Sequence, residues 1–305
     1  MNDRNRNNRS SKRPPLWVSL AIIVLMIAAY RLGLADTLLD SLENWAGPSY
    51  THMPGEGLYI HFLSVGKADS ILVIADGEAM LVDAGEADTV DYVISYLKSA
   101  GVYELDAIIA THPHLDHIGG MSYVIEEFSP ELCYISSKTH TTATYERLMR
   151  ALGTKGVETL VPQPGDSYSL GGAVMEFVGP MDEYENINDC SLVFALEYQG
   201  IRVLFTGDAE SESESDMISS GRDLSADVLK VAHHGSNSSS KNAFLRQVMP
   251  DYAIITQKDI SDSSDKVIER LEDVGARIYS TDSGEVVLSV EGGVLKIEQN
   301  EQKKP

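Results

Sequence analysis

THPHLDHIGG, at residues 111–120, is the most informative segment of the chain. It places three imidazoles and one carboxylate within six residues: His112, His114, Asp116 and His117. It directly follows the apolar run LDAIIA at residues 105–110, which is typical of a central strand covered on both faces. A turn at the end of such a strand lets alternate side chains converge, and nitrogen and oxygen ligands of this kind suit a divalent cation. The segment therefore predicts a metal site.

Two later segments repeat the arrangement of an apolar run followed by polar candidates. Asp208 follows IRVLFT at residues 201–206, and His233 and His234 follow DVLKVA at residues 227–232. Because every candidate comes just after an apolar strand, the strand ends are expected to meet along one rim. Taken alone, Asp208 also fits a helix N-cap and the histidine pair fits a structural role. The first motif favours ligation for all three.

Strand-like and helix-like segments alternate through both halves of the chain. The expected strands are residues 58–65, 71–75, 79–83, 105–111, 191–198, 201–207, 227–232, 252–257, 276–280, 285–290 and 293–298. The expected helices are residues 89–99, 121–128, 241–248 and 266–274. Gln199-Gly200 is a plausible hairpin turn. This interleaving predicts a sandwich of two sheets with helices packed outside.

Composition limits the classes of function. The chain has 305 residues, 43% of them hydrophobic, enough to bury one large core or two modest ones. Its formal net charge is −22, which disfavours a sequence-reading DNA binder because an acidic surface repels a phosphate backbone. The two cysteines, Cys133 and Cys190, are too few for a disulfide framework, and we expect two buried free thiols rather than one disulfide.

The N-terminus predicts membrane targeting. Residues 16–30 read LWVSLAIIVLMIAAY, follow a basic segment, and fall short of the about 20 residues that a spanning helix needs. An uncleaved anchor, extended to Leu34 past a snorkelling Arg31, is favoured. A cleaved signal remains open, because Gly33-Leu34-Ala35 offers small residues to a peptidase. The positive-inside rule places the body outside the cytoplasm, as a single-pass protein of the cell membrane or as a secreted one.

Seven segments resemble a known family. They are HFLSVGKADSILV, MLVDAG, THPHLDHIGG, NDCSLVFAL, VLFTGDAE, LKVAHHGS and STDSGEVVL, in the family's order. From about Leu58 to Ile297 the chain resembles the metallo-β-lactamase superfamily, and within it the soluble domain of ComEC-type competence proteins. The resemblance implies an α+β fold, an αββα four-layer sandwich, here preceded by one N-terminal membrane-targeting helix. The expected organisation is a basic tip with its targeting segment (1–35), a linker (36–56), a hydrolase domain (57–299) and a tail (300–305).

The resemblance also implies two adjacent divalent ions, Zn or Mn, in a shallow groove. Carried over by position, His112 and His114 hold the first ion, Asp116 and His117 hold the second, and Asp208 bridges them. One of His233 and His234 completes the second site while the other faces the substrate, and His234 is favoured as the ligand. Asp83 is expected to orient the ligands.

Two departures from the family's pattern concern the first metal and the substrate. The usual third histidine is missing where this chain reads NDCS, so Asn188 or Asp189 is expected to take its place. Lys67, Asp69 and Ser70, in one segment, are expected beside the substrate. Asn188, in the NDCS segment, is expected there as well. Lys67 either neutralises a substrate phosphate or is a solvated loop lysine.

The resemblance, with these residues, implies a binuclear metal-dependent hydrolase. Two ions lower the pKa of a shared water from 15.7 to about 7. Asp116 or Asp208 would accept the proton, and His233 or His234 would stabilise the charged transition state. The predicted function is an extracytoplasmic phosphodiesterase or DNA nuclease, with nucleic acid as a substrate only. The alternatives are hydrolysis of a small ester, such as a phosphocholine ester or a lactone, and a non-catalytic metal-binding relative, which the missing histidine favours.

Overall fold

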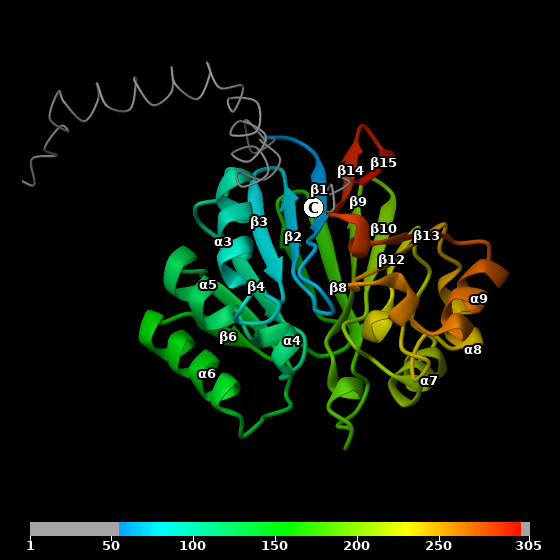
Figure 1. Cartoon of the computed structure of the whole chain (residues 1–305), viewed down its shortest axis with the longest axis horizontal. Coiled ribbons are helices and arrows are strands. Elements are labelled where there is room, and N and C mark those ends of the chain that lie inside the picture. The colour runs from blue at the N-terminus through cyan, green and yellow to red at the C-terminus, as the bar shows by residue number, and fades with distance from the viewer. Residues whose placement is uncertain (1–54, 300–305) are drawn as a thin grey trace, which may run out of the picture. The chain divides into compact units, whose positions relative to one another are not determined.

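The computed structural model describes residues 55–299, which form two β-sheets with helices on their outer faces (Figure 1). The first sheet has eight strands in the order β15-β14-β1-β2-β3-β4-β5-β6. Its strands are β1 (Leu58–Phe62), β2 (Ile71–Ala75), β3 (Glu78–Val82), β4 (Ala107–Ala110), β5 (Leu132–Ile135), β6 (Glu158–Leu160), β14 (Val286–Glu291) and β15 (Val294–Gln299). The second sheet has seven, in the order β13-β12-β11-β10-β9-β8-β7. These are β7 (Ser167–Leu170), β8 (Ala173–Gly179), β9 (Val193–Tyr198), β10 (Ile201–Phe205), β11 (Val228–Lys230), β12 (Tyr252–Ile255) and β13 (Arg277–Ser280).

The helices divide between the outer faces of the two sheets. Those beside the first sheet are α3 (Val90–Ser99), α4 (Leu115–Ile118), α5 (Met121–Phe128) and α6 (Ala143–Lys155). Those beside the second are α7 (Ser211–Ser219), α8 (Asn242–Val248) and α9 (Asp265–Asp273). The predicted sandwich of two sheets with helices outside is confirmed.

Alternation along the strands builds the layers. In β2, Leu72 and Ile74 pack toward the helices of the first sheet, while Ile71 and Val73 pack into the core between the sheets. Successive side chains of a strand point to opposite faces, so a fully apolar strand must be covered on both sides. The central core also contains Phe177, Phe194 and Phe205 from the second sheet. Three apolar layers thus hold the fold together.

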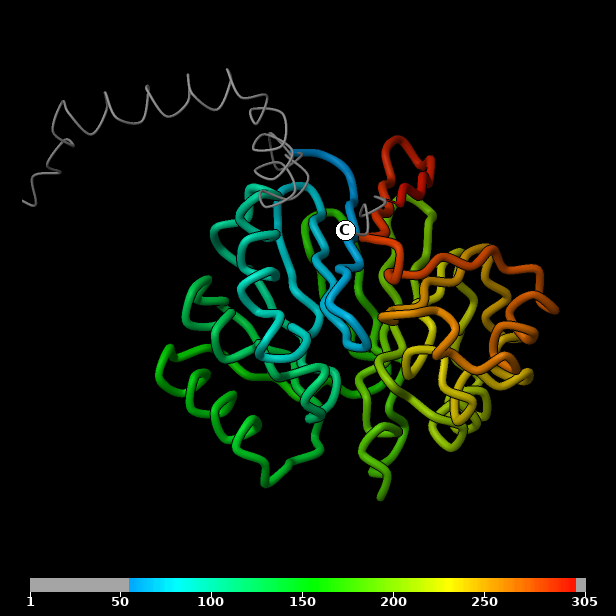
Figure 2. Tube along the Cα trace, viewed as in Figure 1, coloured from blue at the N-terminus to red at the C-terminus, as the bar shows by residue number. Residues whose placement is uncertain are grey.

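Parallel strands carry the polar segments to one edge. β3, β4, β5 and β6 run parallel in the first sheet, and β10, β11, β12 and β13 run parallel in the second. The carboxyl ends of parallel neighbours lie on the same side, so the residues that follow them share one edge of each sheet. The final hairpin, red in Figure 2, returns to the first sheet, where β14 pairs with β1, shown in blue. Strands from the beginning and the end of residues 55–299 are therefore paired in one sheet.

Several local predictions can be compared directly with the structure. The hairpin at Gln199-Gly200 is confirmed, with both residues at positive φ (50° and 82°), as a tight turn between antiparallel β9 and β10 requires. Cys133 and Cys190 are confirmed as buried free thiols. The predicted targeting segment, most of the predicted linker and the predicted tail lie outside the described residues. Among residues 55–299, no helix has the length and apolar character needed to cross a membrane.

Candidate metal centre

The candidate residues follow the carboxyl ends of three strands, β4, β10 and β11, and meet between the two sheets' edges. His112 follows β4, Asp208 follows β10, and His233 and His234 lie in the short turn after β11. Gly207, at φ +50°, precedes Asp208, and an added Cβ there would lie 2.9 Å from the Cβ of Ser191. Only glycine fits this crowded left-handed position, so the sequence Gly-Asp fixes the direction of the Asp208 side chain.

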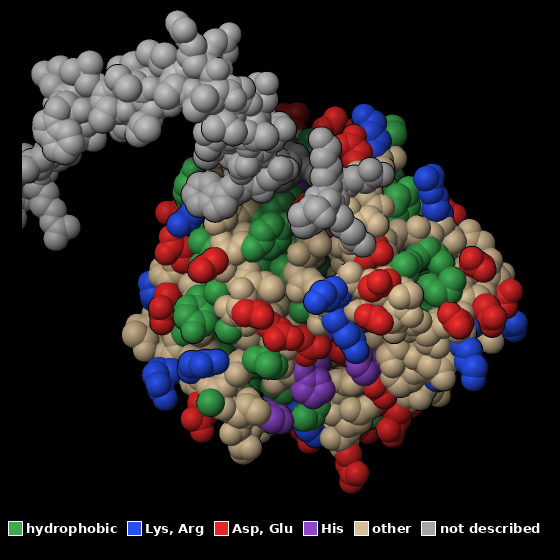
Figure 3. Space-filling model, in the orientation of Figure 1, with side chains coloured by type: hydrophobic (Ala, Val, Ile, Leu, Met, Phe, Trp, Pro, Cys, Tyr) green, Lys and Arg blue, Asp and Glu red, His purple; other side chains and the backbone are tan. Residues whose placement is uncertain are grey.

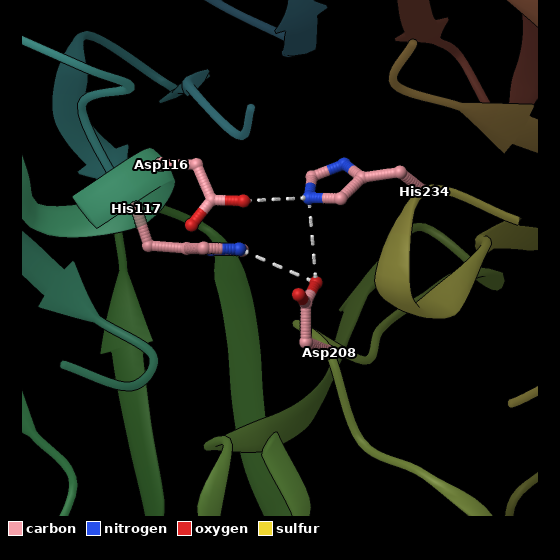
Figure 4. A group of neighbouring side chains, drawn as sticks. All are labelled: Asp116, His117, Asp208 and His234. Carbon is pink, nitrogen blue, oxygen red and sulfur yellow. Dashed lines mark ion pairs between the residues drawn. The ribbon is translucent and has the colours of Figure 1, made fainter. Parts of the chain in front are cut away.

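Asp208 is the centre of the cluster (Figure 4). Its Oδ1 lies 3.3 Å from His117 Nε2 and 3.7 Å from His234 Nε2. His234 Nε2 also lies 3.5 Å from Asp116 Oδ2, which closes the group drawn in Figure 4. One ligand atom from each of these four residues lies within 4.8 Å of the others. They come from α4, from the loop after β10 and from the turn after β11, so residues far apart in sequence share one small volume.

The other oxygen of Asp208 faces a different histidine from the first motif. Asp208 Oδ2 lies 3.9 Å from His112 Nε2, and His112 Nε2 lies 3.0 Å from His114 Nδ1. The rings of His112 and His114 meet edge to face, with centroids 4.7 Å apart. The first motif therefore divides, with His112 and His114 on one side of Asp208 and Asp116 and His117 on the other.

Acceptors behind the imidazoles fix their orientation. His117 Nδ1 lies 2.7 Å from Asp83 Oδ2, and Asp83 also accepts hydrogen bonds from the backbone and hydroxyl of Thr111 at 2.9 and 2.7 Å. His234 Nδ1 lies 2.9 Å from the carbonyl oxygen of Thr256. A partner at Nδ1 leaves the Nε2 lone pair of each ring directed at Asp208, which is the arrangement of metal-ligating histidines. Asp83 thus lies behind His117, in the position expected for a residue that orients a ligand.

A buried ion pair underlies the cluster. Lys230 Nζ lies 2.6 Å from Asp69 Oδ2, and both side chains are almost completely buried, at 1% and 2% exposure. Asp69 Oδ1 accepts a hydrogen bond from the Thr256 hydroxyl and lies 3.6 Å from His234 Nδ1. Burial would raise the pKa of Asp69, but the charges of Lys230, His234 and His117 together outweigh burial and lower it. Asp69 is therefore a charged group held behind His234.

The cluster fits divalent metal ions. His117 Nε2, His234 Nε2 and Asp208 Oδ1 are buried and have no hydrogen-bond partner among residues 55–299, although all three face one another. Buried polar atoms without partners are costly, and a bound cation would satisfy all three at once. Asp69, Asp83, Asp116 and Asp208 also bring four carboxylates together, of which Lys230 offsets one. Donor type and excess negative charge both favour cations.

The pKa values of His117 and Asp208 also reflect the excess of carboxylates in the cluster. Burial alone would lower the pKa of His117, but the carboxylates of Asp208 and Asp83 outweigh it and raise that pKa well above the usual value. Burial would raise the pKa of Asp208, but the imidazoles of His117 and His234 hold it well below the usual range. The carboxylates around His117 therefore favour positive charge at this position, which a bound cation would also supply.

Three residues lie elsewhere than the sequence predicted. Asp69 and Ser70, expected beside the substrate, are 1% and 0% exposed, because their loop tucks under the histidines. Asp189, expected to replace the missing first-site ligand, has hydrogen bonds at both oxygens, and its Oδ2 accepts from the Asn186 amide at 3.0 Å. Its Oδ1 accepts from the backbone N–H of Glu210 and Ser213, at 2.9 and 3.1 Å. The first turn of a helix has unpaired N–H groups, and this carboxylate satisfies them at α7.

Lys67 and Asn188 are the remaining residues predicted to lie beside the substrate. Lys67 is exposed, and its part in substrate binding stays a prediction. Asn188 is 8% exposed, and its Nδ2 donates to Glu210 Oε1 at 2.9 Å. Glu210 was not predicted from the sequence, yet its Oε1 lies 3.0 Å from His233 Nδ1. Lys230 was also missed, although a lysine inside the apolar strand DVLKVA signals a buried acidic partner.

Glu214 fixes the loop that follows His234. It is 1% exposed, and its carboxylate accepts hydrogen bonds from the backbone N–H of Ser240 and Lys241, so it ties α7 to the start of α8. Burial raises the pKa of Glu214 to about 7, against the opposing effect of those two hydrogen bonds. Glu214 therefore keeps its proton to a higher pH in the folded chain than in the unfolded chain.

This raised pKa predicts that stability falls as pH rises. The contribution of Glu214 is complete below its ordinary pKa of 4.5 and is lost as the pH passes through about 7. Between pH 5 and pH 8, wild type should lose roughly 2–3 kcal/mol more unfolding free energy than Glu214→Gln, measured by urea denaturation. Glu212→Gln, on the exposed face of the same helix, is the matched control. Parallel pH profiles for wild type and Glu214→Gln would contradict the assignment.

Two curated relatives are competence proteins. The chain is 27% identical over 257 residues to ComE operon protein 3 of Bacillus subtilis, covering 76% of this chain and 33% of that protein. It is 26% identical over 301 residues to competence protein ComA of Neisseria gonorrhoeae, covering 94% of this chain and 40% of that protein. The chain thus spans well under half the length of these relatives.

Fold and family comparisons agree with the architecture. The metallo-beta-lactamase fold protein YhfI from Bacillus subtilis superimposes with a TM-score of 0.51 at 14% identity, covering 75% of this chain and 98% of that one, which shows the fold alone. A family model described as the metallo-beta-lactamase superfamily matches residues 63–256, more than half of the chain. That range contains β4 with its histidine motif, Asp208 and the pair His233 and His234. The chain belongs to the metallo-beta-lactamase superfamily, with a histidine and aspartate cluster suited to metal.

Proposed function

We propose that the chain is a binuclear metal-dependent phosphodiesterase. One observation carries the proposal: the buried carboxylate of Asp208 faces His112 with one oxygen and faces His117 and His234 with the other. A carboxylate with imidazoles on both sides is the arrangement that bridges two cations. His112 and His114 would hold the first ion, and Asp116, His117 and His234 the second, with Zn or Mn as the metal.

The proposed chemistry is hydrolysis by water. Two bound divalent ions supply a nucleophile at neutral pH by acidifying water, and they polarise the bond under attack. The chain's own task is to receive the proton. Of the four carboxylates in the cluster, Asp116 is the most open, at 29% side-chain exposure, against 2% or less for Asp69, Asp83 and Asp208. Asp116 is therefore the group placed to accept a proton and pass it to solvent.

The substrate class is inferred from the relatives and from the surface. The similarity to two competence proteins supports a phosphodiester, with DNA as one form of it. Acidic side chains are spread over the face shown in Figure 3, where histidine side chains also reach the surface. With a net charge of −22, this surface repels a long phosphate backbone and favours a small diester. Hydrolysis of a small ester, such as a phosphocholine ester or a lactone, is the second candidate on the same ground.

A location outside the cytoplasm is part of the proposal. It is supported by the basic residues that precede the apolar segment at residues 16–30, which orient a targeting segment with its basic end in the cytoplasm. Protease treatment of intact spheroplasts should digest the catalytic domain if it lies outside. A domain that is protected until the cells are lysed would contradict this orientation.

A substrate panel tests the activity. Chain purified without chelator is assayed on bis-p-nitrophenyl phosphate, single-stranded DNA and several lactones, with metal content measured in parallel. Turnover of the small diester supports the proposal, and cleavage of DNA as well would extend it to a nuclease. Lactone turnover without diester turnover would replace it by the second candidate. Two bound ions with no turnover of any substrate would favour a non-catalytic relative.

Asp116→Asn tests whether Asp116 accepts the proton. The amide keeps an oxygen for the metal but cannot take up a proton, so kcat at saturating metal should fall roughly 10²–10⁴-fold. Asp91→Asn, on the exposed face of α3, is the control. An unchanged kcat at saturating metal would show that another group accepts the proton.

A further inference from the structure

The first metal site lacks a ligand at the position where the family carries a third histidine. In this chain Asp189 accepts from backbone N–H groups at the start of α7. Asn188 donates its amide hydrogen to Glu210, and its buried Oδ1 has no hydrogen-bond partner among residues 55–299, so Asn188→Ala tests whether it supplies a ligand. With Asp208 Oδ2, His112 and His114 give the first ion three protein ligands. A zinc site ordinarily has three or four, so one position is left for a further donor or for water.

His233 faces the same oxygen of Asp208 as His112 does. Its Nε2 lies 3.7 Å from Asp208 Oδ2, and His112 Nε2 lies 3.9 Å from that atom. His234 Nε2 lies 3.7 Å from the opposite oxygen, Oδ1. With metal–ligand bonds of about 2.0–2.2 Å, two ligand atoms on one ion lie roughly 3–4 Å apart. His233 and His234 thus face different oxygens of the Asp208 carboxylate.

Backbone strain separates the two imidazoles. His233 and His234 are both left-handed, at φ 49° and 51°, and their rings are inclined by 73° with centroids 6.2 Å apart. A left-handed residue other than glycine costs roughly 1–2 kcal/mol, so a consecutive pair is retained only where the surrounding structure demands it. The strained turn directs two consecutive side chains to opposite sides of Asp208.

Glu210 orients His233 through Nδ1, in the same way that acceptors at Nδ1 orient His117 and His234. Its Oε1 lies 3.0 Å from His233 Nδ1, as Asp83 lies 2.7 Å from His117 Nδ1. Glu210 is itself fixed by amide hydrogens from Asn188, at 2.9 Å, and Asn186, at 3.0 Å. A carboxylate at Nδ1 sets the tautomer and leaves the Nε2 lone pair free for a metal. The pattern of Nδ1 toward an acceptor and Nε2 toward Asp208 is shared by His117, His233 and His234.

We propose that His233, oriented by Glu210, ligates the first metal ion beside His112 and His114, so that each oxygen of Asp208 serves one ion. This ligand set rests on the proposed binuclear centre and gives it a complete first site without the family's third histidine. Glu210 is a positioning residue that acts through His233. A histidine that only contacted the substrate would not need its Nε2 opposite a buried carboxylate oxygen.

Metal affinity tests the ligand set without any assay of activity. Purified chains are dialysed against graded Mn²⁺ or Zn²⁺, and bound metal is measured by inductively coupled plasma mass spectrometry. Wild type should bind two ions. His233→Ala should lose the first ion and retain the second. His234→Ala should lose the second ion and retain the first. Cobalt(II) substitution should give visible spectra that differ between the two variants, because different sites remain filled. Circular dichroism checks that each variant is folded.

Glu210 provides variants that are less disruptive. Glu210→Gln keeps an acceptor oxygen and Glu210→Ala removes it, so the affinity for the first ion should fall about 10–100-fold, more for Ala than for Gln. The affinity for the second ion should not change. Glu212→Gln, two residues further along and exposed, is the matched control and should bind metal as wild type does.

The outcomes distinguish this proposal from the proposed function. Two ions retained by His233→Ala with unchanged affinity would overturn the ligand assignment, even if kcat/KM falls, since that result marks a substrate contact. Loss of the first ion from Asn188→Ala, with retention in His233→Ala, would assign the position to Asn188 instead. Wild type that binds two ions and turns over no substrate would defeat the phosphodiesterase, and the loss of one ion from His233→Ala would still support the ligand set.

Discussion

Asp208→Ala is expected to bind neither metal ion firmly and to lower diester turnover by on the order of 10³-fold or more, because metal catalysis supplies several kcal/mol of transition-state stabilisation. The reason is geometric. Asp208 supplies one oxygen to His112 and the other to His117 and His234, so a single substitution removes a ligand from both ions. Bound metal and initial rates, measured on the same preparation, check the prediction.

The control for this substitution is an aspartate outside the cluster. Asp182→Ala changes an exposed carboxylate and should leave metal content and rate unchanged. Asp208→Asn adds a graded case, since the amide retains one oxygen donor and should keep one ion better than the other. If Asp208→Ala retained two ions and most of its turnover, a bridging carboxylate at this position would be excluded.

Lys230→Met should destabilise the fold by about 3–5 kcal/mol, because it leaves the buried Asp69 carboxylate without its partner. Lys230 and Asp69 are 1% and 2% exposed, so water cannot replace the lost ammonium. The melting temperature of the metal-free chain should fall by roughly 10 °C. Thermal unfolding in the presence of chelator measures this effect apart from the stabilisation that bound metal gives.

A second substitution separates the lost ion pair from lost packing. Asp69→Asn removes the stranded charge, so the double variant with Lys230→Met should recover at least half of the lost stability. Lys266→Met, at an exposed position of α9, should change the unfolding free energy by no more than about 0.5 kcal/mol. A Lys230→Met chain within about 1 kcal/mol of wild type would contradict the view that this ion pair is buried and dry.

The sequence predicted the parts of the fold that have strong local patterns. Apolar runs such as ILVIA gave β2 with its bounds unchanged, and Met121–Phe128 was predicted residue for residue as α5. The stretch from β5 to β8 was not predicted as strands and helices. There α6 carries a polar sequence, ATYERLMRALGTK, and buries only Leu148, Ala151 and Leu152, so its periodicity is weak. Its start is set by the Thr142 side chain, which accepts from the backbone of Tyr145.

The candidate site was predicted in its main members but not in their supports. Histidines after strand ends are visible in the sequence because their type and spacing are unusual. Glu210 and Thr256 carry no such signal, since their partners His233 and His234 are 23 and 22 positions away in the chain. Lys230 in its apolar strand signals a buried acidic partner, but not that the partner is Asp69, 161 positions away. The sequence could not decide the role of Asp189, because a carboxylate near such a motif can either bind metal or accept hydrogen bonds from the backbone. In the structure its Oδ1 accepts from the unpaired N–H groups at the start of α7.

Anomalous diffraction from crystals grown with Mn²⁺ or Zn²⁺ tests the central claim most directly. The claim is that side chains from the ends of β4, β10 and β11 gather around a pair of cations shared by Asp208. The expected map has two anomalous peaks, one on each side of the Asp208 carboxylate, each about 2.0–2.2 Å from one of its oxygens. Peaks located elsewhere on the chain, or no peak between Asp208 and the surrounding imidazoles at saturating metal, would contradict it.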